Sequence, residues 1–384
     1  MSRHWTARED SLEIKEMPFY WRLTDHGNSE EGIVGRMPIR IRCLQDLDLL
    51  EYQPAPAETA ALEAAYRQDA NIGFLNPESG QIATYGASVN RFFLDVVNAH
   101  RPRRIYEIGC GAGFSIGFLK EHGWKVTGID PSEYSLQWSE RLGFTLLNTF
   151  FDGTELVGEA DFIYCNDVFE HISNVGDFAA RVWRALAPGG VFCFATTSST
   201  RSIELGDISM LEHQHVNMFT ERSIRLILAQ AGFGLVDIRS GSYGNTFQVV
   251  AIKGGQPDRN LPAAACQGFF ARAERAIEAF AKFHAASGES CSYYVPLRCI
   301  PYLAAVGDFG TRSIFDSNPA WRGKYIDGYG RSISAVEDIP PADGRSFFVG
   351  SLTFFEDIRS TLRDRGYADE NIFSIARLGG MVAP

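Results

Sequence analysis

A doubly wound α/β fold is predicted for the centre of this chain, on two observations. Between residues 104 and 252, short apolar runs alternate with segments of helical periodicity, the pattern of a parallel sheet covered by helices. The first run breaks at Gly109, Gly111 and Gly113 and resumes as a helix, as in nucleotide-type cofactor sites. The length of 384 residues suggests two or three domains.

The segment before this pattern is expected to form a small N-terminal domain over residues 1–70. It lacks clear periodicity at first, and its expected elements are a strand at 39–44 and an Ala-, Leu- and Glu-rich helix at 57–67. Residues 71–86 are expected to be irregular. Apolar residues at helical spacing then predict a helix over 87–99, which ends before Pro102.

The core is predicted to occupy residues 71–254. An antiparallel pair closes the expected sheet, because its last two strands are near enough in sequence to form a hairpin. A long loop is expected over 196–220. The expected strands are 104–108, 125–129, 144–147, 161–165, 191–195, 235–239 and 246–252, and the expected helices are 114–121, 132–142, 175–186 and 221–231.

A second, smaller α/β domain is predicted for residues 255–384. Gly254 to Pro257 forms a plausible linker, and an Ala-, Phe- and Ile-rich stripe predicts a helix over 264–286. The remaining expected elements are strands at 300–306, 313–315 and 346–349 and a helix at 354–365.

Composition and charge narrow the class of protein. The formal net charge of −11 argues against nucleic acid or an anionic membrane as the main partner. No apolar run approaches the roughly 20 residues of a membrane span, and the N-terminus lacks the apolar region of a signal peptide. The seven cysteines include no C-x-x-C pair, so we expect reduced thiols in a cytoplasmic protein, with no zinc or disulfide framework.

The glycine turn favours a nucleoside cofactor over a dinucleotide. Phe114 stands where a dinucleotide fingerprint needs Gly or Ala, which disfavours NAD. Asp130 ends the next strand, about 20 residues later, where a carboxylate can accept both hydroxyls of an unmodified ribose. Each feature alone also has a structural explanation, since a glycine turn can be merely a turn and an Asp can cap a helix.

Four segments in order resemble the class I S-adenosylmethionine-dependent methyltransferases, whose core is a seven-stranded Rossmann-like sheet. They are 107–113 (EIGCGAG), 128–130 (GID), 161–171 (DFIYCNDVFEH) and 186–191 (LAPGGV). The resemblance implies S-adenosylmethionine as cofactor. It also implies that Glu107 and the glycine backbone hold its methionine part and Asp130 its ribose, that Asn166 and Asp167 lie beside it, and that Asp152 lies near adenine.

A narrower resemblance spans nearly the whole chain. It is to three-domain methyltransferases of nucleotide-linked deoxysugars, including C-methylating ones, and rests on 42–54, 316–324 and the Glu212-His213 pair. In that group the first of these segments belongs to a zinc ribbon, but here only Cys43 remains of its paired cysteines, so no metal is expected. Met210 stands where the group often has Tyr. The resemblance implies a sugar-nucleotide acceptor.

The loop after the fifth core strand carries the predicted base. Methyl transfer from a sulfonium needs chiefly alignment of the acceptor, and a weakly acidic acceptor also needs proton removal. Histidine titrates near neutral pH, so His213, oriented by Glu212, is the first choice and His215 the second. His171 is also expected to face the pocket, and Tyr85 to close over the cofactor. Helix capping or a polar loop position would equally explain these histidines.

The expected function is therefore S-adenosylmethionine-dependent methylation of a small molecule, a sugar nucleotide first, on carbon or oxygen. Arg298, Arg312 and Lys324 are candidates for contacts to a diphosphate. The alternatives are an O-methyltransferase of a non-sugar metabolite and a catalytically silent cofactor-binding protein. The acceptor atom and the oligomeric state stay open.

Overall fold

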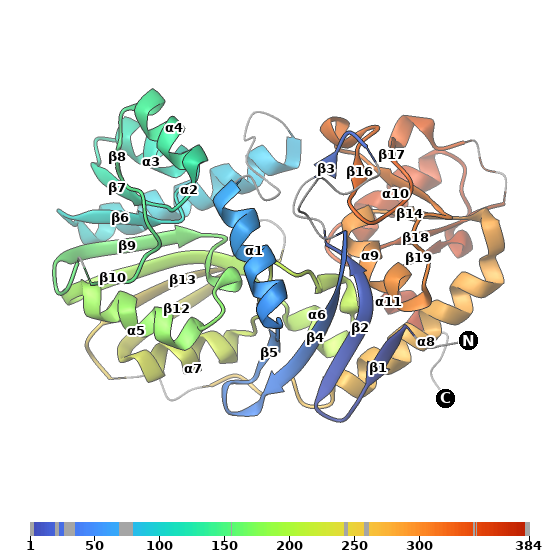
Figure 1. Ribbon diagram of the computed structural model, residues 1–384, viewed down its shortest axis with the longest axis horizontal. Helices are drawn as coiled ribbons and strands as arrows, with labels where there is room; N and C mark the ends of the chain where they lie inside the picture. The colour runs from blue at the N-terminus through green and yellow to red at the C-terminus, as the bar shows by residue number, and fades with distance from the viewer. Residues whose placement is uncertain are drawn as a thin grey trace.

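Three sheets of five or more strands organise the chain (Figure 1). The computed structural model describes residues 4–19, 23–26, 35–68, 80–154, 156–241, 245–256, 261–340, 342 and 344–380. A seven-stranded sheet and a parallel five-stranded sheet lie at opposite ends of the long axis, and an antiparallel five-stranded sheet lies between and below them. Within the described ranges, no helix has the length and apolar character needed to span a membrane.

The seven-stranded sheet has the order β12-β13-β10-β9-β6-β7-β8. Its strands are parallel except at β13, which runs antiparallel to both neighbours. From β6 the chain moves outward to β7 and β8 and then returns to β9 on the other side of β6, which creates a topological switch point. The bounds are β6 (Ile105–Ile108), β7 (Val126–Ile129), β8 (Thr145–Leu147), β9 (Ala160–Asn166), β10 (Leu186–Thr197), β12 (Phe233–Ser240) and β13 (Thr246–Lys253).

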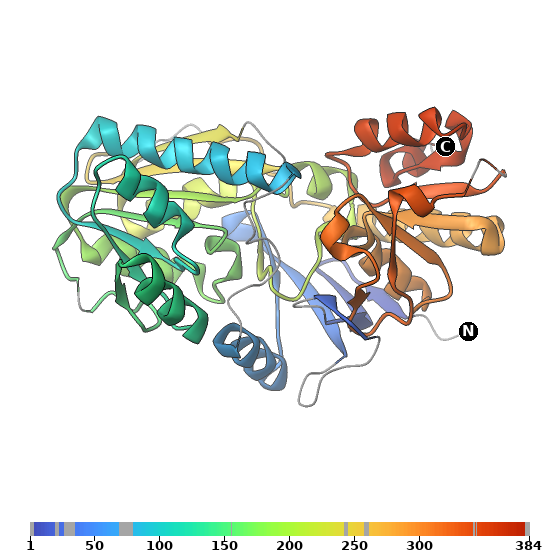
Figure 2. The ribbon, with the colours of Figure 1, turned by 90° about the horizontal axis from the view of Figure 1, so that it is seen from above.

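Helices cover both faces of this sheet (Figure 2). One face packs against α2 through Val89, Phe93 and Val97, and the other against α5 and α7. Contrary to expectation, α2 starts at Gly80 rather than at residue 87, so residues 80–86 are helical. The bounds are α2 (Gly80–His100), α3 (Phe114–Glu121), α4 (Glu133–Leu142), α5 (Val175–Ala185) and α7 (Glu221–Ala231).

The antiparallel sheet has the order β1-β2-β4-β5-β11. Its first strands alternate buried and more exposed residues, as in Leu12 and Ile14 or Ile39 and Ile41, with a period of two. The strand expected at 39–44 lies within β4, whereas β1 and β2 were not predicted. Helix α1 follows the fourth strand, and β11 comes from the middle of the chain. The bounds are β1 (Trp5–Ala7), β2 (Ser11–Pro18), β4 (Arg36–Leu44), β5 (Leu49–Tyr52), α1 (Pro56–Gln68) and β11 (Asn217–Met218).

The parallel five-stranded sheet has the order β17-β15-β14-β18-β19. The prediction of a strand at 300–306 is wrong, because that apolar run lies inside a helix that is buried on nearly every side, and periodicity does not separate the two cases. The strand at 291–294 was missed. The bounds are α8 (Phe269–Ser287), β14 (Cys291–Tyr294), α9 (Pro296–Val306), β15 (Ser313–Asp316), β17 (Ile333–Ala335), β18 (Ser346–Val349), α10 (Phe355–Asp364), β19 (Ile372–Phe373) and α11 (Ile375–Gly380).

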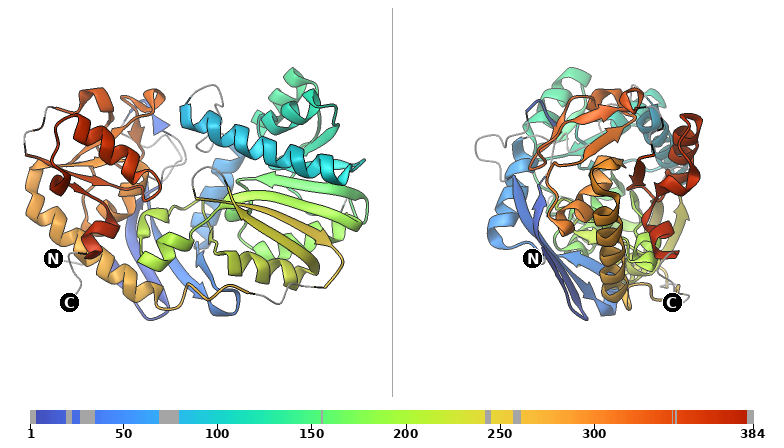
Figure 3. Two further views of the ribbon diagram at one scale, coloured as in Figure 1. Left: turned by 180° about the vertical axis from the view of Figure 1, so that it is seen from behind. Right: turned by 90° about the vertical axis from the view of Figure 1, so that its right-hand side faces the viewer.

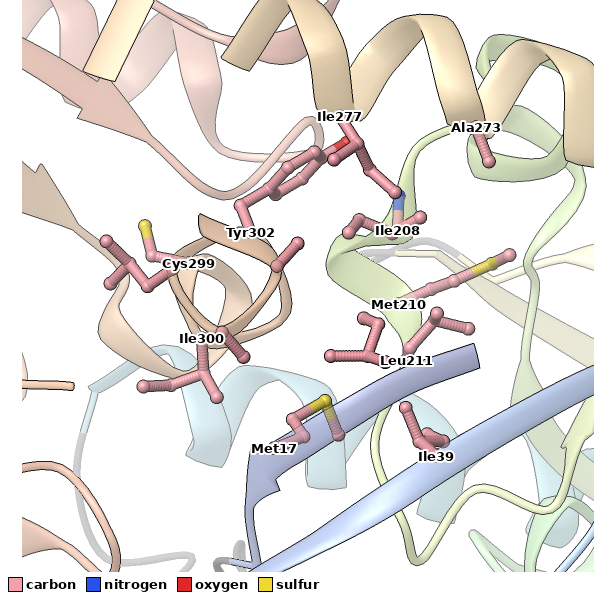
Figure 4. Close-up of a cluster of buried hydrophobic side chains, with 14 of the residues drawn as sticks. Met17, Ile39, Ile208, Met210, Leu211, Ala273, Ile277, Cys299, Ile300 and Tyr302 are labelled. Atoms are coloured by element: carbon pink, nitrogen blue, oxygen red, sulfur yellow. The ribbon is translucent and has the colours of Figure 1, made fainter. Parts of the chain in front are cut away.

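The segment after β10 joins all three sheets. Its first part was expected to be a loop but contains α6 (Thr200–Leu205) and a 3-10 turn, η3 (Ile208–Met210). Figure 3 shows this segment, in green, between the two end sheets. Figure 4 shows Ile208, Met210 and Leu211 packed between β2, β4, α8 and α9. The Tyr302 hydroxyl donates to Asp207 Oδ1 at 2.8 Å and accepts from the Ile208 amide at 3.1 Å, so residues 207–211 are held from two sides.

The domain limits at 70 and 254 stay a prediction. The seven-stranded sheet ends with β13 at residue 253, but β11 at 217–218 belongs to the same sheet as the N-terminal strands. Residues 212–216 carry the predicted base. They therefore lie between the seven-stranded sheet and the antiparallel sheet. Their position is set by packing that no local pattern in the sequence reveals.

Candidate active site

The glycine turn lies at the carboxyl end of β6, beside the switch point. Gly109 and Gly113 have φ angles of 69° and 72°, a backbone conformation that residues with a side chain rarely adopt. A Cβ on Gly109 would lie 2.5 Å from Val168 Cγ2, and one on Gly113 would lie 2.4 Å from Phe144 Cε1. Both positions therefore require glycine, and the amides at the start of α3 are left facing the crevice.

Asp130 is buried at the end of β7 and is fixed by three hydrogen bonds. Its Oδ2 accepts from the Gly111 amide at 2.9 Å, and its Oδ1 accepts from the amide and hydroxyl of Ser132 at 2.9 and 2.7 Å. These bonds use three of the four or so acceptor sites of the carboxylate, so Oδ2 keeps one further site. The glycine turn and the acidic strand end are thus tied together, which is an arrangement that fits a ribose.

Glu107 lies inside the sheet beneath this turn, with 3% of its surface exposed. Burial raises the pKa of its carboxyl to about 8, although the Tyr164 hydroxyl donates to Oε2 at 2.9 Å. The site therefore favours the neutral acid over the carboxylate. A neutral acid can donate a hydrogen bond, which a carboxylate cannot.

The carboxyl end of β9 brings Tyr85, Asn166 and Asp167 together. The Tyr85 hydroxyl, from α2, lies 2.7 Å from Asp167 Oδ1 and 3.3 Å from Asn166 Oδ1. Asn166 Nδ2 donates to Asp167 Oδ2 at 3.1 Å. Burial raises the pKa of the Asp167 carboxyl, and nearby Glu170 adds to this effect. Asp167 has a φ of 50°, a conformation uncommon without glycine, so the three side chains are held in one position at the switch point.

The loop 212–217 is fastened to the short turn that follows β9. His171 Nδ1 donates to the Gln214 carbonyl at 2.8 Å, and Asn217 Nδ2 donates to the Ile172 carbonyl at 2.8 Å. The rings of His171 and His215 lie edge to face, with centroids 4.9 Å apart. This brings His215 to the carboxyl edge of β9.

Glu212 forms its ion pair with His215, at 2.5 Å from Oε1 to Nδ1. Burial works against the charged imidazole, yet the carboxylates of Glu212 and Glu170 together outweigh it and raise the pKa of His215 above its ordinary value. With Nδ1 donating to Glu212, the neutral ring keeps its lone pair on Nε2. The pair has the form of a base oriented by a carboxylate.

The expectation that Glu212 orients His213 is corrected by this geometry. His213 is 1% exposed, and its ring packs edge-on against Phe19 and Tyr52, at centroid distances of 5.5 and 5.7 Å. Its Nε2 donates to the Met37 carbonyl at 3.3 Å. Burial lowers the pKa of His213 to about 4. His213 therefore belongs to the core of the antiparallel sheet, and the chain bends at residues 213–214 before it reaches His215.

Asp152 lies farther out, on an exposed turn. Its Oδ1 accepts from the amide and hydroxyl of Thr154 at 2.8 and 2.7 Å, which lowers the pKa of the carboxyl. It lines a small hollow that Ile129, Leu147 and Leu156 also line. The hollow adjoins the end of β7, on the same side as Asp130.

Two further charged residues approach the site. Glu170 is fully buried beside His171, and its carboxylate accepts from Thr196 Oγ1 at 2.8 Å and the Thr197 amide at 3.3 Å. Glu170 lies within the 161–171 segment, where no local pattern predicts its role. Arg298, in the first turn of α9, lies near enough to His215 to oppose its positive charge and so to lower its pKa. Only the packing of α9 beside η3 reveals that proximity.

Three of these residues are also close enough to share a cation. Glu170, His171 and His215 each offer a ligand atom, and these atoms lie within 4.8 Å of one another. Imidazole and carboxylate groups are ordinary ligands of divalent metals. The expectation that the protein binds no metal therefore stays a prediction.

Comparison with known proteins agrees with this geometry. Residues 80–238 match the model of a family described as a methyltransferase domain. A ubiquinone biosynthesis O-methyltransferase of Aromatoleum aromaticum is 25% identical over 41% of this chain and 75% of its own length. One of Methylococcus capsulatus is 29% identical over 30% and 54%, and a mitochondrial one of Schizosaccharomyces pombe is 24% identical over 30% and 46%. This chain thus spans about half the length of the last two.

Among solved structures, two similar ones have TM-scores below 0.5. A possible histamine N-methyltransferase of Thermotoga maritima has a TM-score of 0.35 at 19% identity, covering 45% of this chain and 96% of that one. A 1,6-didemethyltoxoflavin-N1-methyltransferase of Burkholderia thailandensis, solved with S-adenosylhomocysteine, has a TM-score of 0.39 at 20% identity, covering 56% and 95%.

The matched region begins with α2 and ends within β12, so it contains the glycine turn, the acidic end of β7 and the switch point at β9. The residues at that edge fit a sulfonium nucleoside, since the N-terminus of α3 at Gly113 has no side-chain cap and Oδ2 of Asp130 keeps one acceptor site. The chain is an enzyme with a class I S-adenosylmethionine-dependent methyltransferase domain.

Proposed function

We propose that this methyltransferase acts on a carbon or an oxygen of a nucleotide-linked sugar, and that His215, oriented by Glu212, removes the acceptor's proton. The observation that carries the proposal is the Glu212–His215 ion pair, at 2.5 Å, beside His171 at the carboxyl edge of β9. Ligands of such sheets bind outside that edge, at the switch point.

The chemistry asked of the protein is alignment and proton removal. When bound, S-adenosylmethionine supplies an electrophilic methyl group. His215 Nε2 accepts the proton of a hydroxyl, or of a carbon next to a carbonyl, while Glu212 holds the N–H of Nδ1 and stabilises the imidazolium that forms. We propose that Asp130 accepts from the ribose hydroxyls, that Asn166, Asp167 and Tyr85 fix the wall beside the cofactor, and that Glu107 and the glycine amides bind the amino-acid part.

The parallel five-stranded sheet supports the sugar-nucleotide acceptor. In its order, β17-β15-β14-β18-β19, the first strand in sequence lies at the centre, so a second switch point falls between β14 and β18. Asp316 ends β15, the place that corresponds to Asp130 in the other sheet, and burial raises the pKa of its carboxyl to about 6. Arg298 begins the helix that follows β14 and approaches His215. An acceptor with an anionic group would lie between Arg298 and His215.

A second candidate is O-methylation of a non-sugar metabolite. The curated relatives are named ubiquinone biosynthesis O-methyltransferases, and their similarity covers only the methyltransferase region. The same His215 would serve a phenolic or enolic hydroxyl. The two candidates differ in whether Arg298 and the parallel five-stranded sheet contribute to binding of the acceptor.

Binding and methyl-transfer assays separate them. Uridine and thymidine diphosphates are titrated into the purified chain with S-adenosylhomocysteine present, and labelled methyl transfer is followed with nucleotide sugars and with simple phenols. We expect a nucleoside diphosphate to bind and Arg298→Gln to weaken that binding at least tenfold. Arg322→Gln is the matched control, because Arg322 is exposed and pairs with Asp338. Methylation of phenols together with no binding of either diphosphate would favour the second candidate.

A further inference from the structure

Two cysteines meet at a place outside the active site. Cys43 lies near the end of β4, and Cys266 lies three residues before α8. Their side chains adjoin each other beside Asp48, and both pack in one apolar cluster. Two thiols far apart in sequence are thus brought together where the antiparallel sheet meets the segment that leads into α8.

A buried carboxylate fixes this contact. Asp48, 3% exposed and in the turn between β4 and β5, accepts from the amides of Ala265 and Cys266, at 3.0 and 2.9 Å. The Cys266 thiol also lies 3.2 Å from the Asp48 carbonyl oxygen. Cys43 pairs with Leu50 across the same hairpin, so one hairpin positions both sulfur atoms.

The two thiols differ in access and in ionisation. Cys43 is half-buried, whereas Cys266 and the other five cysteines are buried. The neighbouring Cys266 side chain lowers the pKa of Cys43, against the effects of burial and of the Asp48 charge. The same contact raises the pKa of Cys266. Burial raises the pKa of the other five, which are Cys110, Cys165, Cys193, Cys291 and Cys299.

We propose that Cys43 and Cys266 form a reversible disulfide, in which the Cys43 sulfur attacks a peroxide and the Cys266 sulfur then resolves the product. An accessible thiolate next to a second thiol is the arrangement of redox-sensitive cysteines. The Cys43 sulfur attacks hydrogen peroxide and becomes a sulfenic acid, with release of one water. The Cys266 sulfur then attacks that sulfenic acid, and a second water leaves. Two thiols are oxidised and one peroxide is reduced.

The disulfide would join the antiparallel sheet to the segment before α8. It would close a loop of about 220 residues that contains the whole seven-stranded sheet, and closing a long loop restricts the unfolded chain. We therefore expect the oxidised protein to unfold at a higher temperature than the reduced one, and a dithiol reductant to reverse the shift.

The test treats the reduced full-length chain with a small excess of hydrogen peroxide and maps its peptides by mass spectrometry. We expect a peptide pair joined through Cys43 and Cys266 to form first. On a non-reducing denaturing gel, the cross-linked chain should migrate faster than the reduced chain. Oxidation that begins at another cysteine, or a Cys43 that goes to higher oxides without joining Cys266, would overturn the proposal.

Three variants separate the roles of the two thiols. Cys43→Ala should abolish the cross-link. Cys266→Ala should leave a Cys43 sulfenic acid that a 1,3-dione reagent traps. Cys193→Ala, in β10 of the seven-stranded sheet, is the control and should form the cross-link at the parent rate. Circular dichroism of each variant establishes that it is folded, and trapping at Cys266 in the Cys43→Ala variant would contradict the assigned order.

Discussion

His213 and His215 are two residues apart on one loop, yet they lie in two different regions of the molecule. His213 points into the core of the antiparallel sheet, where Phe19, Tyr52 and the Met37 carbonyl surround it. His215 points to the carboxyl edge of β9, where it pairs with Glu212 and packs against His171. The same type of side chain is thus a core residue at position 213 and a candidate base at position 215. The difference comes from the apolar surroundings of His213 and from the Glu212 carboxylate that pairs with His215.

The largest effect is expected from the side of the loop that faces β9. His215→Gln should lower the rate of methyl transfer at saturating acceptor by roughly 10²–10⁴-fold, the range for loss of a general base. Affinity for S-adenosylhomocysteine, measured by calorimetry, should stay within a few-fold. His213→Gln is the matched control and should retain most of the turnover per folded molecule. The reverse ranking of the two variants would contradict the assignment.

Next in size is the effect expected at the cofactor side of the same edge. Asp130→Asn should weaken binding of S-adenosylhomocysteine by roughly 10–100-fold, since a hydrogen bond to a charged group contributes about 1.5–3 kcal/mol. Isothermal titration calorimetry measures the change. Asp152→Asn provides a comparison, because Asp152 is exposed and already bonded to Thr154. Unchanged affinity in the Asp130 variant would exclude it as a ribose ligand.

Replacement of His213, which faces the core of the antiparallel sheet, should lower the free energy of unfolding and leave catalysis largely unchanged. His213→Leu leaves the Met37 carbonyl without its donor, and an unsatisfied buried polar group costs about 1–3 kcal/mol. Urea unfolding followed by tryptophan fluorescence should show this loss. Turnover corrected for the folded fraction should change little, and a large loss of corrected turnover at full stability would make His213 part of the active site.

The last prediction concerns the pH dependence of stability, which the acid beneath the glycine turn should influence. Burial raises the pKa of Glu107 in the folded state to about 8, from an ordinary value of 4.5. The folded state therefore binds more protons between these values, and the stabilising contribution of Glu107 is complete below pH 4.5 and lost as pH rises through 8. Glu107→Gln should flatten the fall in unfolding free energy between pH 5 and 8. An identical slope in the parent chain would show that Glu107 is ionised at neutral pH.

Local patterns predicted the core of the fold well. The glycine turn, Asp130 and the apolar strands are encoded in contiguous residues, because strand, turn and helix preferences act over a few positions. The helix α9 was predicted as a strand, since a helix buried on most of its surface shows no amphipathic period.

The site was less predictable because loop residues take their direction from tertiary contacts. Nothing within 212–216 shows which histidine faces β9. That choice depends on Ile208 and Leu211 packing against β2, β4 and α9, and on β11 pairing with β5. The proximity of Arg298 to His215 likewise arises from the packing of α9 beside η3.

A crystal structure of the chain with S-adenosylhomocysteine tests the central claim most directly. We predict that the ribose hydroxyls lie within hydrogen-bond distance of the Asp130 carboxylate and that the sulfur faces the space beside His215 Nε2. A nucleoside bound away from Asp130, or a sulfur that faces His213 instead, would contradict the account.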